Sequence, residues 1–423
     1  MLSTNISLSS GVSNQSTITR DTDNLSTTIQ TVTTPSALLD LVFLPWSGYE
    51  HIFVTATSTS TLSLYTLTPD PAPKINHIYT HQCTDTSILL TDVEAHPDVR
   101  GLIGYVTSSG LVSIIEFNLD VLITNNETGQ DIPTHDLVRY HHSSPCADDG
   151  FEAWTLAFAP PSAPGSPDGE ARTVIGVYTG SDDSTLRRLD FALGPDAASS
   201  ARSSLQGATE RDEDDSDDDD DDDDDDEDDD DKAQSATLQI LDRRSHDAGV
   251  VAILPLLPHP HSRSGEYLLT GSYDDRLRVL CRPSGAATPA VRNSVLAETN
   301  LDGGVWRLKL ISSSSSDAQD GASRSWTVLA SCMHAGARVV RITQTVGEEE
   351  GVGQWTVVVL ARFEEHASMN YGSDVQPVVL PSQDESEGVG QREGMSGAMV
   401  KGTRTVVSTS FYDRRMCLWR IDC

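Results

Sequence analysis

The chain has 423 residues, with 64 acidic and 29 basic side chains and a formal net charge of −35. Binding to a nucleic-acid backbone needs a basic face, so we expect no direct nucleic-acid binding. The sequence has no run of 18 apolar residues and no basic start followed by an apolar block. We therefore expect neither a membrane span nor a secretory signal, and a cytoplasmic location.

Short β-branched runs dominate the chain, and no long helical period interrupts them. Before them, residues 1–34 are rich in Ser and Thr and are a candidate for one closing strand. The runs lie at 52–57, 62–67, 102–107, 111–117, 173–179, 186–191, 249–254, 267–271, 277–281, 305–311, 327–331, 338–343, 355–361, 404–409 and 416–421. This pattern is typical of an all-β protein with many short strands.

One motif recurs along the chain: two apolar residues, a few small or aromatic residues, an Asp or its substitute, and then another apolar strand. The clear copies lie at 177–183, 268–274 and 407–413, and the weaker ones at 54–58, 104–108 and 329–334. A strand, a tight turn and a returning strand cannot bury both faces alone, so the copies must stack around an axis. We predict a WD-repeat β-propeller of seven blades, six of them visible, with 118–150 as a candidate for the seventh.

A dense acidic window interrupts the predicted propeller. Residues 210–231 hold 20 acidic residues and one basic residue, and so carry 19 of the 35 net negative charges. Such a run repels itself and has nothing apolar to bury. We expect N-terminal blades over 35–206, a disordered acidic insertion over 207–232 between the third and fourth copies of the motif, and C-terminal blades over 233–423.

Two histidines precede strands at the position from which a WD-repeat histidine commonly bonds the turn Asp and a strand Thr. The expected sets are His246 with Thr270 and Asp274, and His366 with Thr409, Asp413 and Trp419. Because buried polar groups are normally satisfied, we expect these residues to be structural.

Familiar catalytic and cofactor motifs are missing from the sequence. It has no Walker loop, no dinucleotide fingerprint, no HExxH and no GxSxG elbow. The histidines at 141, 142, 259 and 261 share no metal-ligand spacing with Cys or carboxylate residues. We therefore expect no cofactor and no metal.

Several aromatic and charged residues fall in loops that begin or join strands, and such loops converge on one mouth of a propeller. They lie at 151–154, 303–307 and 369–372, and at the turn positions Tyr273, His334 and Tyr412. Aromatic walls with a few polar groups suit a cationic or amphipathic ligand. The alternative is that Trp154 and Trp306 simply pack between blades.

Taken in order, the motifs form a more specific set than any one of them does alone. They lie at 151–154, 178–183, 271–274, 303–307, 330–334 and 410–413. In this order they resemble one WD-repeat family, the diphthine methyl esterases of the diphthamide pathway, over about residues 150–422. The resemblance implies removal of a methyl ester from methylated diphthine on translation elongation factor 2, which releases methanol and gives diphthine for the final amidation. It also implies contact with other proteins of that pathway.

Ester hydrolysis needs a base to activate water and donors for the oxyanion. We expect His334 to be the base, because it replaces the turn Asp of its blade, and Glu152 to orient it or to act in its place. The expected substrate-binding residues are Trp154, Tyr273, Trp306, Arg307, Tyr371 and Tyr412. Arg307 and Ser272 are candidates for the oxyanion donor, and Ser272 and Cys332 stay open as covalent nucleophiles.

Two other functions stay open. Propellers more often serve as non-catalytic scaffolds for protein complexes, and a fold alone does not establish catalysis. The acidic run would also fit a histone or ribosome-assembly chaperone that holds basic proteins.

Overall fold

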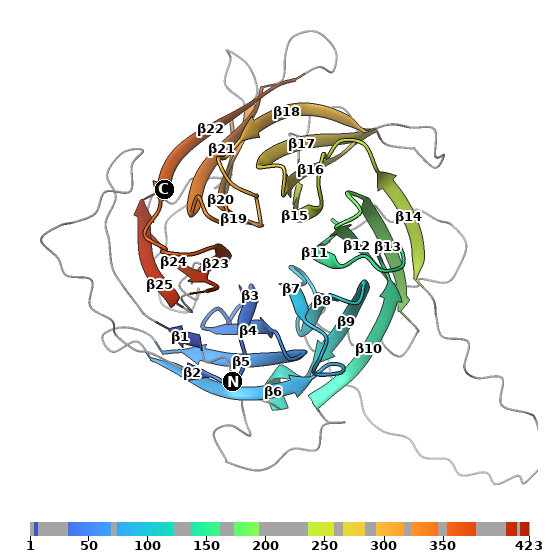
Figure 1. Ribbon diagram of the computed structural model, residues 1–423, viewed down its shortest axis with the longest axis vertical. Coiled ribbons are helices and arrows are strands. Elements are labelled where there is room, and N and C mark those ends of the chain that lie inside the picture. Colours follow the sequence, from blue (N-terminus) through green and yellow to red (C-terminus); the bar gives the residue numbers. More distant parts are fainter. Residues whose placement is uncertain are drawn as a thin grey trace, which may run out of the picture.

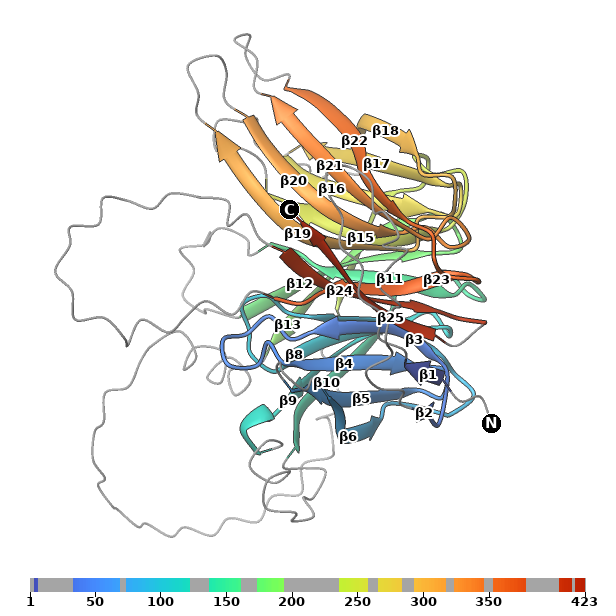
Figure 2. The same cartoon turned by 90° about the vertical axis from the view of Figure 1, so that its left-hand side faces the viewer.

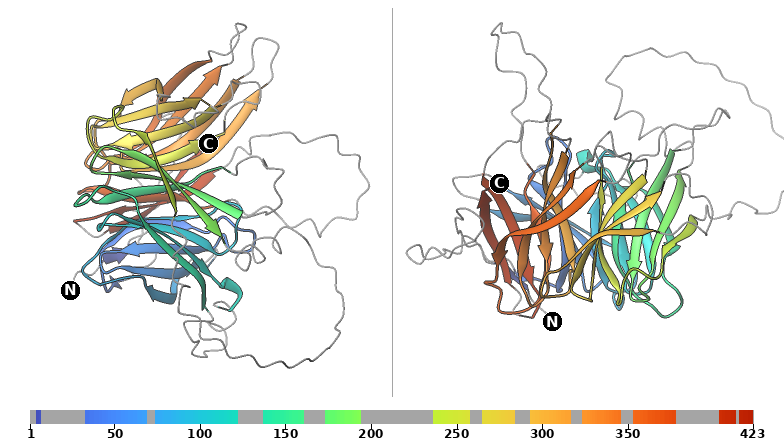
Figure 3. Two further views of the ribbon diagram at one scale, coloured as in Figure 1. Left: turned by 90° about the vertical axis from the view of Figure 1, so that its right-hand side faces the viewer. Right: turned by 90° about the horizontal axis from the view of Figure 1, so that it is seen from above.

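The computed structural model describes residues 4–6, 33–68, 74–121, 137–160, 173–193, 236–257, 265–283, 293–316, 323–345, 353–377, 403–412 and 415–422. Their strands form six sheets around a common axis (Figure 1). The strands run largely along that axis in side view (Figure 2 and Figure 3). The predicted all-β propeller is therefore confirmed. Among these residues, no helix is both long and apolar enough to span a membrane.

Each blade has its innermost strand first in the chain. Blade 1 is β3 (Leu38–Phe43), β4 (Ile52–Thr57), β5 (Thr61–Leu67) and β6 (Ile75–Gln82), and blade 2 is β7 (Leu90–Ala95), β8 (Leu102–Thr107), β9 (Leu111–Phe117) and β10 (Val138–Pro145). Blade 3 is β11 (Ala153–Phe158), β12 (Thr173–Ser181), β13 (Leu186–Leu193) and β14 (Thr237–Asp242), and blade 4 is β15 (Val250–Leu256), β16 (Gly265–Ser272), β17 (Arg276–Pro283) and β18 (Ser294–Asn300). Blade 5 is β19 (Arg307–Ser316), β20 (Ser323–Ser331), β21 (Ala337–Thr345) and β22 (Gln354–Phe363). Blade 6 is β23 (Asn370–Val375), β24 (Thr403–Ser410) and β25 (Arg415–Asp422), with β1 (Thr4–Ile6) and β2 (Thr33–Thr34) at its outer edge.

The six blades close the ring by themselves. The innermost strands contact one another in chain order, and β23 contacts β3. A closed ring leaves no place for a further blade, so the predicted count of seven is corrected to six. Residues 118–150, the candidate for the seventh blade, instead supply β10, which pairs with β9 as the outer strand of blade 2.

The acidic window lies inside a blade and not between two blades. Blade 3 is interrupted between the end of β13 at Leu193 and the start of β14 at Thr237, and the insertion predicted over 207–232 falls there, outside the described residues. β14 still pairs with β13, with Leu238 opposite Leu189. The sequence motif marks the turn between the second and third strands of a blade. The fourth strand has no such motif, so the sequence gives no signal for β14.

The start of the described chain completes the last blade. β1 pairs in parallel with β25, with Asn5 opposite Arg415. β2 then pairs antiparallel with β1, with Thr33 opposite Asn5. The first and last described strands therefore share one sheet.

Strands in the middle of a blade are buried on both faces. Every residue of β4 and β8 is buried. Each blade packs between two neighbours, so both faces of its sheet are buried. The usual alternation of apolar and polar residues is therefore lost. Aromatic stacking adds to this packing, as between Tyr267 of blade 4 and Trp355 of blade 5, whose ring centroids lie 5.2 Å apart.

Aspartates fix the turns after the second strands of blades 3 and 4. Asp183 and Asp274 each pair with the arginine four residues further on, Arg187 and Arg278. Each carboxylate also accepts a hydrogen bond from the backbone amide two residues on. The recurring Asp therefore orders the turn, as its type and position predict.

The histidine sets agree with the sequence in part. His246 Nε2 lies 2.9 Å from Thr270 Oγ1, as expected. The carboxylate of Asp274 does not complete that set, because Arg278 and the amide of Asp247 occupy it.

The set around His366 differs from the expected one. His366 Nε2 lies 2.7 Å from Ser408 Oγ, which also accepts a hydrogen bond from Trp419 Nε1 at 2.9 Å. Thr409, the expected partner, points the other way along β24 and accepts a hydrogen bond from the amide of Gly372. Neighbouring side chains of a strand face opposite sides, so a shift of one residue changes the partner. Asp413 lies outside the described residues.

Candidate active site

One face of the ring gathers the loops that the sequence motifs single out. Antiparallel pairing places the start of each innermost strand beside the end of the second strand, so Ala153 lies opposite Ser181 and Val250 opposite Ser272. The residues before an innermost strand and the turn after the second strand therefore lie on the same face. We call this the top face.

Six aromatic rings form one continuous group on the top face. The aromatic cluster consists of Trp154, Tyr273, Trp306, Tyr371, Phe411 and Tyr412. The ring centroid of Trp306 lies 5.2 Å from that of Trp154 and 5.7 Å from that of Tyr273. Tyr371 lies 4.5 Å from Trp306, and Phe411 connects Tyr371 to Tyr412. The structure thus brings together five predicted substrate-binding residues, and adds Phe411 to them.

The rings of the cluster differ in their access to solvent. Trp306 is only 2% exposed, and its indole Nε1 has no hydrogen-bond partner among the described residues. Trp154, Tyr273 and Tyr371 are half-buried, and Tyr412 is 68% exposed. Trp306 therefore supports the other rings from beneath, while those rings keep surface that a ligand can reach.

Two carboxylates adjoin the cluster at blade 3. Asp182 Oδ1 accepts a hydrogen bond of 2.6 Å from Trp154 Nε1, and the Asp182 amide donates to the Glu152 carbonyl at 3.1 Å. Burial raises the pKa of Glu152, and the charge of Asp182 raises it further. Burial also raises the pKa of Asp182, although the bond from Trp154 opposes the shift. Asp182 was not among the site residues predicted from the sequence. Its only signal is the doublet with Asp183, of which the turn needs just one member.

His334 occupies the turn position that Asp183 and Asp274 occupy in their blades. It lies four residues before Arg338, as those aspartates lie before their arginines, but Arg338 pairs with Glu364 at 3.0 Å and donates to the carbonyl of Ala335. The imidazole of His334 is exposed on the turn. The expectation that His334 is freed from the structural ion pair of its blade therefore agrees with the structure.

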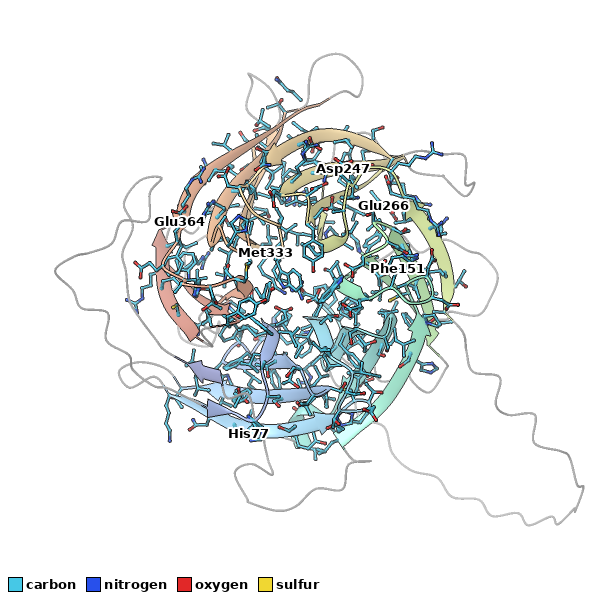
Figure 4. All side chains as sticks on the ribbon, viewed as in Figure 1. His77, Phe151, Asp247, Glu266, Met333 and Glu364 are labelled. Atoms are coloured by element: carbon cyan, nitrogen blue, oxygen red, sulfur yellow. The ribbon has the colours of Figure 1, made fainter. Side chains whose placement is uncertain are left out.

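The turn that carries His334 is unusual and lies close to the axis. Met333 has φ 45°, a left-handed conformation that is uncommon outside glycine. The amide of Asn370 donates to the Met333 carbonyl at 2.9 Å, which joins this turn to blade 6. Figure 4 shows Met333 near the centre of the ring. The backbone of the turn that carries His334 is therefore held near the axis of the ring.

Two adjacent glycines in the segment before β19 let the turn of His334 pack closely against that segment. A Cβ atom at Gly303 would lie 2.3 Å from the carbonyl oxygen of Cys332. At Gly304 it would lie 2.5 Å from Met333 Sδ. A side chain at Gly303 would meet backbone, whereas one at Gly304 would meet the flexible Met333 side chain, so the close approach depends mainly on Gly303.

Arg307 does not face the cluster's open side. It is 2% exposed, with Nε 3.2 Å from Asp40 and 3.3 Å from Asp92. Its Nη1 donates to the carbonyl of Val251 at 3.0 Å, and its Nη2 to that of Thr91. Residues of blades 1, 2 and 4 therefore surround this guanidinium of blade 5. The prediction that Arg307 binds substrate or an oxyanion is wrong, because Arg307 already neutralises buried carboxylates on the axis.

The carboxylates beside Arg307 carry opposite pKa shifts. Burial raises the pKa of Asp40 well above its usual value. Burial also disfavours ionisation of Asp92, but Arg307 and a hydrogen bond with Asp40 outweigh it and lower the pKa of Asp92. Ionisation is therefore favoured at Asp92 over Asp40. On the same axis, Lys309 of β19 forms an ion pair with Glu94 of β7.

The two candidate nucleophiles are also structural. Ser272 is fully buried, and its Oγ donates to the Ala248 carbonyl and accepts from the Asp274 amide. Cys332 is fully buried, and burial raises the pKa of its thiol to about 12. A thiol is nucleophilic only when ionised, so the buried Cys332 is not suited to attack an ester. Ser272 is not suited either, because it is buried and its hydroxyl already makes two hydrogen bonds. In the part of the chain that the structure describes, no group of three or more His, Cys, Asp or Glu residues could hold a metal ion.

The closed ring of sheets and the Asp-containing turns define a six-bladed β-propeller of the WD-repeat kind. No family model matches the chain. Among solved structures, the crystal structure of Saccharomyces cerevisiae Sqt1 is similar with a TM-score of 0.38 and 10% identity, over 94% of this chain and 75% of that chain. That similarity is too low to support an inference about function.

Sequence similarity narrows the class further. The chain is 29% identical over 180 residues to a Schizosaccharomyces pombe protein named diphthine methyltransferase. The aligned segment covers 42% of this chain and 39% of that protein. It is 31% identical over 140 residues to the Saccharomyces cerevisiae protein of the same name. This second aligned segment covers 31% of this chain and 33% of that protein. The matches therefore span well under half of each relative. They confirm the resemblance to diphthamide-pathway WD-repeat proteins that the ordered motifs predicted.

Proposed function

We propose that this protein acts in diphthamide biosynthesis and hydrolyses the methyl ester of methylated diphthine on translation elongation factor 2. The two relatives support the pathway, since both are named for chemistry on diphthine. The observation that carries the proposal is the aromatic cluster with Glu152 and Asp182 at its edge and the turn of His334 beside it. A cytoplasmic location and contacts with other pathway proteins belong to the same proposal.

The proposed reaction is a water attack assisted by a base. His334 takes a proton from water while the water oxygen bonds to the ester carbonyl carbon. The tetrahedral intermediate then expels the methoxy group, which takes up that proton and leaves as methanol. The carboxylic acid that remains on the protein releases the second proton of the water to solvent and becomes a carboxylate. Glu152 is the second candidate for the base, because its raised pKa brings it closer to neutral pH.

The oxyanion donor needs a new assignment, since Arg307 and Ser272 are engaged elsewhere. We assign it to the phenol of Tyr273. Burial and the neighbouring charge of Asp182 raise the pKa of Tyr273, so its hydroxyl keeps its proton and can donate. Tyr273 lies in the aromatic cluster on the turn between β16 and β17.

The test is to incubate the purified chain with elongation factor 2 that bears methylated diphthine. We expect the modified peptide to lose the mass of one methylene and methanol to appear. No mass loss would favour a non-catalytic scaffold. A mass gain on diphthine that lacks the methyl ester, in the presence of a methyl donor, would instead show methyl transfer. A variant that lacks residues 207–232 should keep turnover, whereas a chaperone that uses the acidic run would lose its basic partners.

A further inference from the structure

Four backbone carbonyls from four blades meet one guanidinium on the axis. Nη1 of Arg307 lies 2.8 Å from the carbonyl oxygen of Trp306 and 3.0 Å from that of Val251. The carbonyl oxygen of Trp154 lies 3.3 Å from the same nitrogen, and Nη2 donates to the carbonyl of Thr91. One buried side chain of blade 5 thus holds the backbone of blades 2, 3 and 4 and of its own blade.

These carbonyls are available because each lies at an irregularity of the sheet. The pairing of the innermost strand shifts by one residue at Thr91, at Trp154 and at Val251. At blade 5 the amide of Trp306 donates to the carbonyl of Ser331, although Ser331 lies opposite the next residue of β19. The extra residue of a β-bulge is left out of the ladder, so its buried carbonyl needs another donor.

The chemistry of arginine suits this position, and that of lysine does not. A guanidinium presents five N–H donors in a rigid plane, whereas an ammonium presents three from a single point. Arg307 directs its donors to the four carbonyls and its charge to Asp40 and Asp92. A lysine in its place would keep the charge but would leave some of the carbonyls without a donor.

Two of the four bulge residues are the tryptophans of the aromatic cluster. A β-bulge re-aims the side chain of its extra residue. Here the bulges aim Trp154 and Trp306 at each other, with ring centroids 5.2 Å apart and planes at 59°. Cζ of Arg307 also lies 5.1 Å from the centroid of the Trp306 ring. The same guanidinium therefore fixes the backbone of both tryptophans.

We propose that Arg307 is a positioning residue of the candidate active site, because its guanidinium holds the bulges that set Trp154 and Trp306 beside each other. Its effect on ester hydrolysis rests on the proposed function, whereas the placement of the two rings does not. In this arrangement Arg307 touches neither the substrate nor the reacting atoms, and it acts through the backbone of the two tryptophans.

Circular dichroism of the full chain tests the placement of the rings without a substrate. Two indoles this close, with their planes inclined, couple their excited states and give two bands of opposite sign in the far ultraviolet. The loss of this couplet in Trp154→Phe assigns it to the pair. We expect Arg307→Lys, which keeps the positive charge, to lose most of the couplet while it retains the β-sheet spectrum.

The matched control is Lys309→Met, which removes the other axial cation of β19. Lys309 pairs with Glu94, and among the described residues it forms no hydrogen bond to the aromatic cluster. Lys309→Met should keep both the couplet and the kcat/KM for methylated diphthine. Arg307→Lys should lower kcat/KM about 10²-fold, as expected when groups that orient a substrate are misplaced. Both variants are measured below their unfolding transitions.

An unchanged couplet in folded Arg307→Lys, or an equal loss of it in Lys309→Met, would overturn the positioning role. If Arg307→Lys does not fold, the double variant Arg307→Met with Asp92→Asn replaces it, because it removes the guanidinium together with a buried carboxylate. Failure of both to fold would also overturn the role, since Arg307 would then support the whole ring.

The two proposals can fail separately. Loss of the couplet with unchanged kcat/KM would reject the effect of Arg307 on hydrolysis. Loss of the couplet in Arg307→Lys, when the parent chain hydrolyses no ester, would leave the placement of the rings intact and reject the proposed function.

Discussion

At the scale of single residues, His334 differs from its counterparts in the neighbouring blades. Asp183 and Asp274 hold an arginine four residues on, while Arg338 turns to Glu364 instead of His334. Among the described residues, no ion pair or hydrogen bond holds the exposed imidazole of His334, so its removal should not disturb the core.

His334→Ala tests that role. We expect turnover on methylated diphthine to fall about 10²- to 10⁴-fold, the usual contribution of a general base, with little change in thermal stability. The measurement is single-turnover hydrolysis followed by mass spectrometry. His51→Ala, which removes an exposed histidine at the opposite face, is the control and should behave as the parent. Parent-level turnover in His334→Ala would move the base to Glu152.

A second residue-scale prediction concerns pH. Burial, with a further contribution from Arg278, lowers the pKa of His246 to about 4. The unfolded chain, with its ordinary histidine value of about 6.5, binds the extra proton first, so stability falls as the pH drops from about 6.5 to 4. The loss is on the order of 3 kcal/mol for this group.

Urea unfolding at pH 7 and pH 4.5 measures that loss. We expect the parent to lose more stability over this interval than His246→Gln does. The same loss in both proteins would show that His246 does not hold a depressed pKa.

The residue scale also shows what sequence alone can and cannot supply. The aromatic members of the cluster stood out because Trp and Tyr in turn positions are conspicuous. Arg307 was misassigned because the string Gly303 to Arg307 does not reveal which side chains turn toward the axis. Its partners, Asp40 and Asp92, are more than 200 residues away in sequence, and only the closed ring brings them together.

At the scale of elements, the turn after β20 is seated by two glycines that differ in what they face. A Cβ atom at Gly303 would meet backbone, the Cys332 carbonyl oxygen at 2.3 Å. At Gly304 it would meet the flexible end of the Met333 side chain at 2.5 Å. Backbone cannot yield as a thioether can.

We therefore expect Gly303→Ala to destabilise the protein by about 1–3 kcal/mol and Gly304→Ala by clearly less. Chemical denaturation of the two variants side by side provides the comparison. Equal effects, or a larger effect at Gly304, would mean that the turn is not held by this contact.

Elements also explain the misplacement of the acidic window. The turn between the second and third strands has an Asp and small residues that sequence analysis detects. The outer strand β14, with the sequence TLQILD, pairs only on one side and has no such signature. In the sequence, an insertion before such a strand follows the last recognisable strand of the blade and is easily taken for an insertion between two blades.

At the scale of the whole molecule, two cations of β19 connect the blades across the axis. Arg307 contacts Asp40 of blade 1, Asp92 of blade 2 and the Val251 carbonyl of blade 4. Lys309 reaches Glu94 of blade 2. Because these groups are buried, removing one charge leaves its partners without compensation.

Arg307→Met should destabilise the protein by about 3–5 kcal/mol, since it leaves the buried carboxyl groups of Asp40 and Asp92 without their cation. The double variant Arg307→Met with Asp92→Asn should recover part of that loss. Equilibrium unfolding of the parent, both single variants and the double variant gives the coupling energy. Strictly additive effects would contradict the axial ion pair.

The net charge of the whole molecule has a limited bearing on function. The acidic window holds 19 of the 35 net negative charges and lies outside the described residues, while the remaining charge belongs to the rest of the chain. Part of it lies at the edge of the aromatic cluster, as Glu152 and Asp182.

Hydrolysis in water enriched in ¹⁸O tests the central claim most directly. If His334 activates water for attack on the ester carbonyl, the diphthine carboxylate will lose one methylene and carry one ¹⁸O, and the methanol will carry none. Methanol that bears the label, or a methyl group that moves to or from diphthine without any label in the carboxylate, would contradict the account.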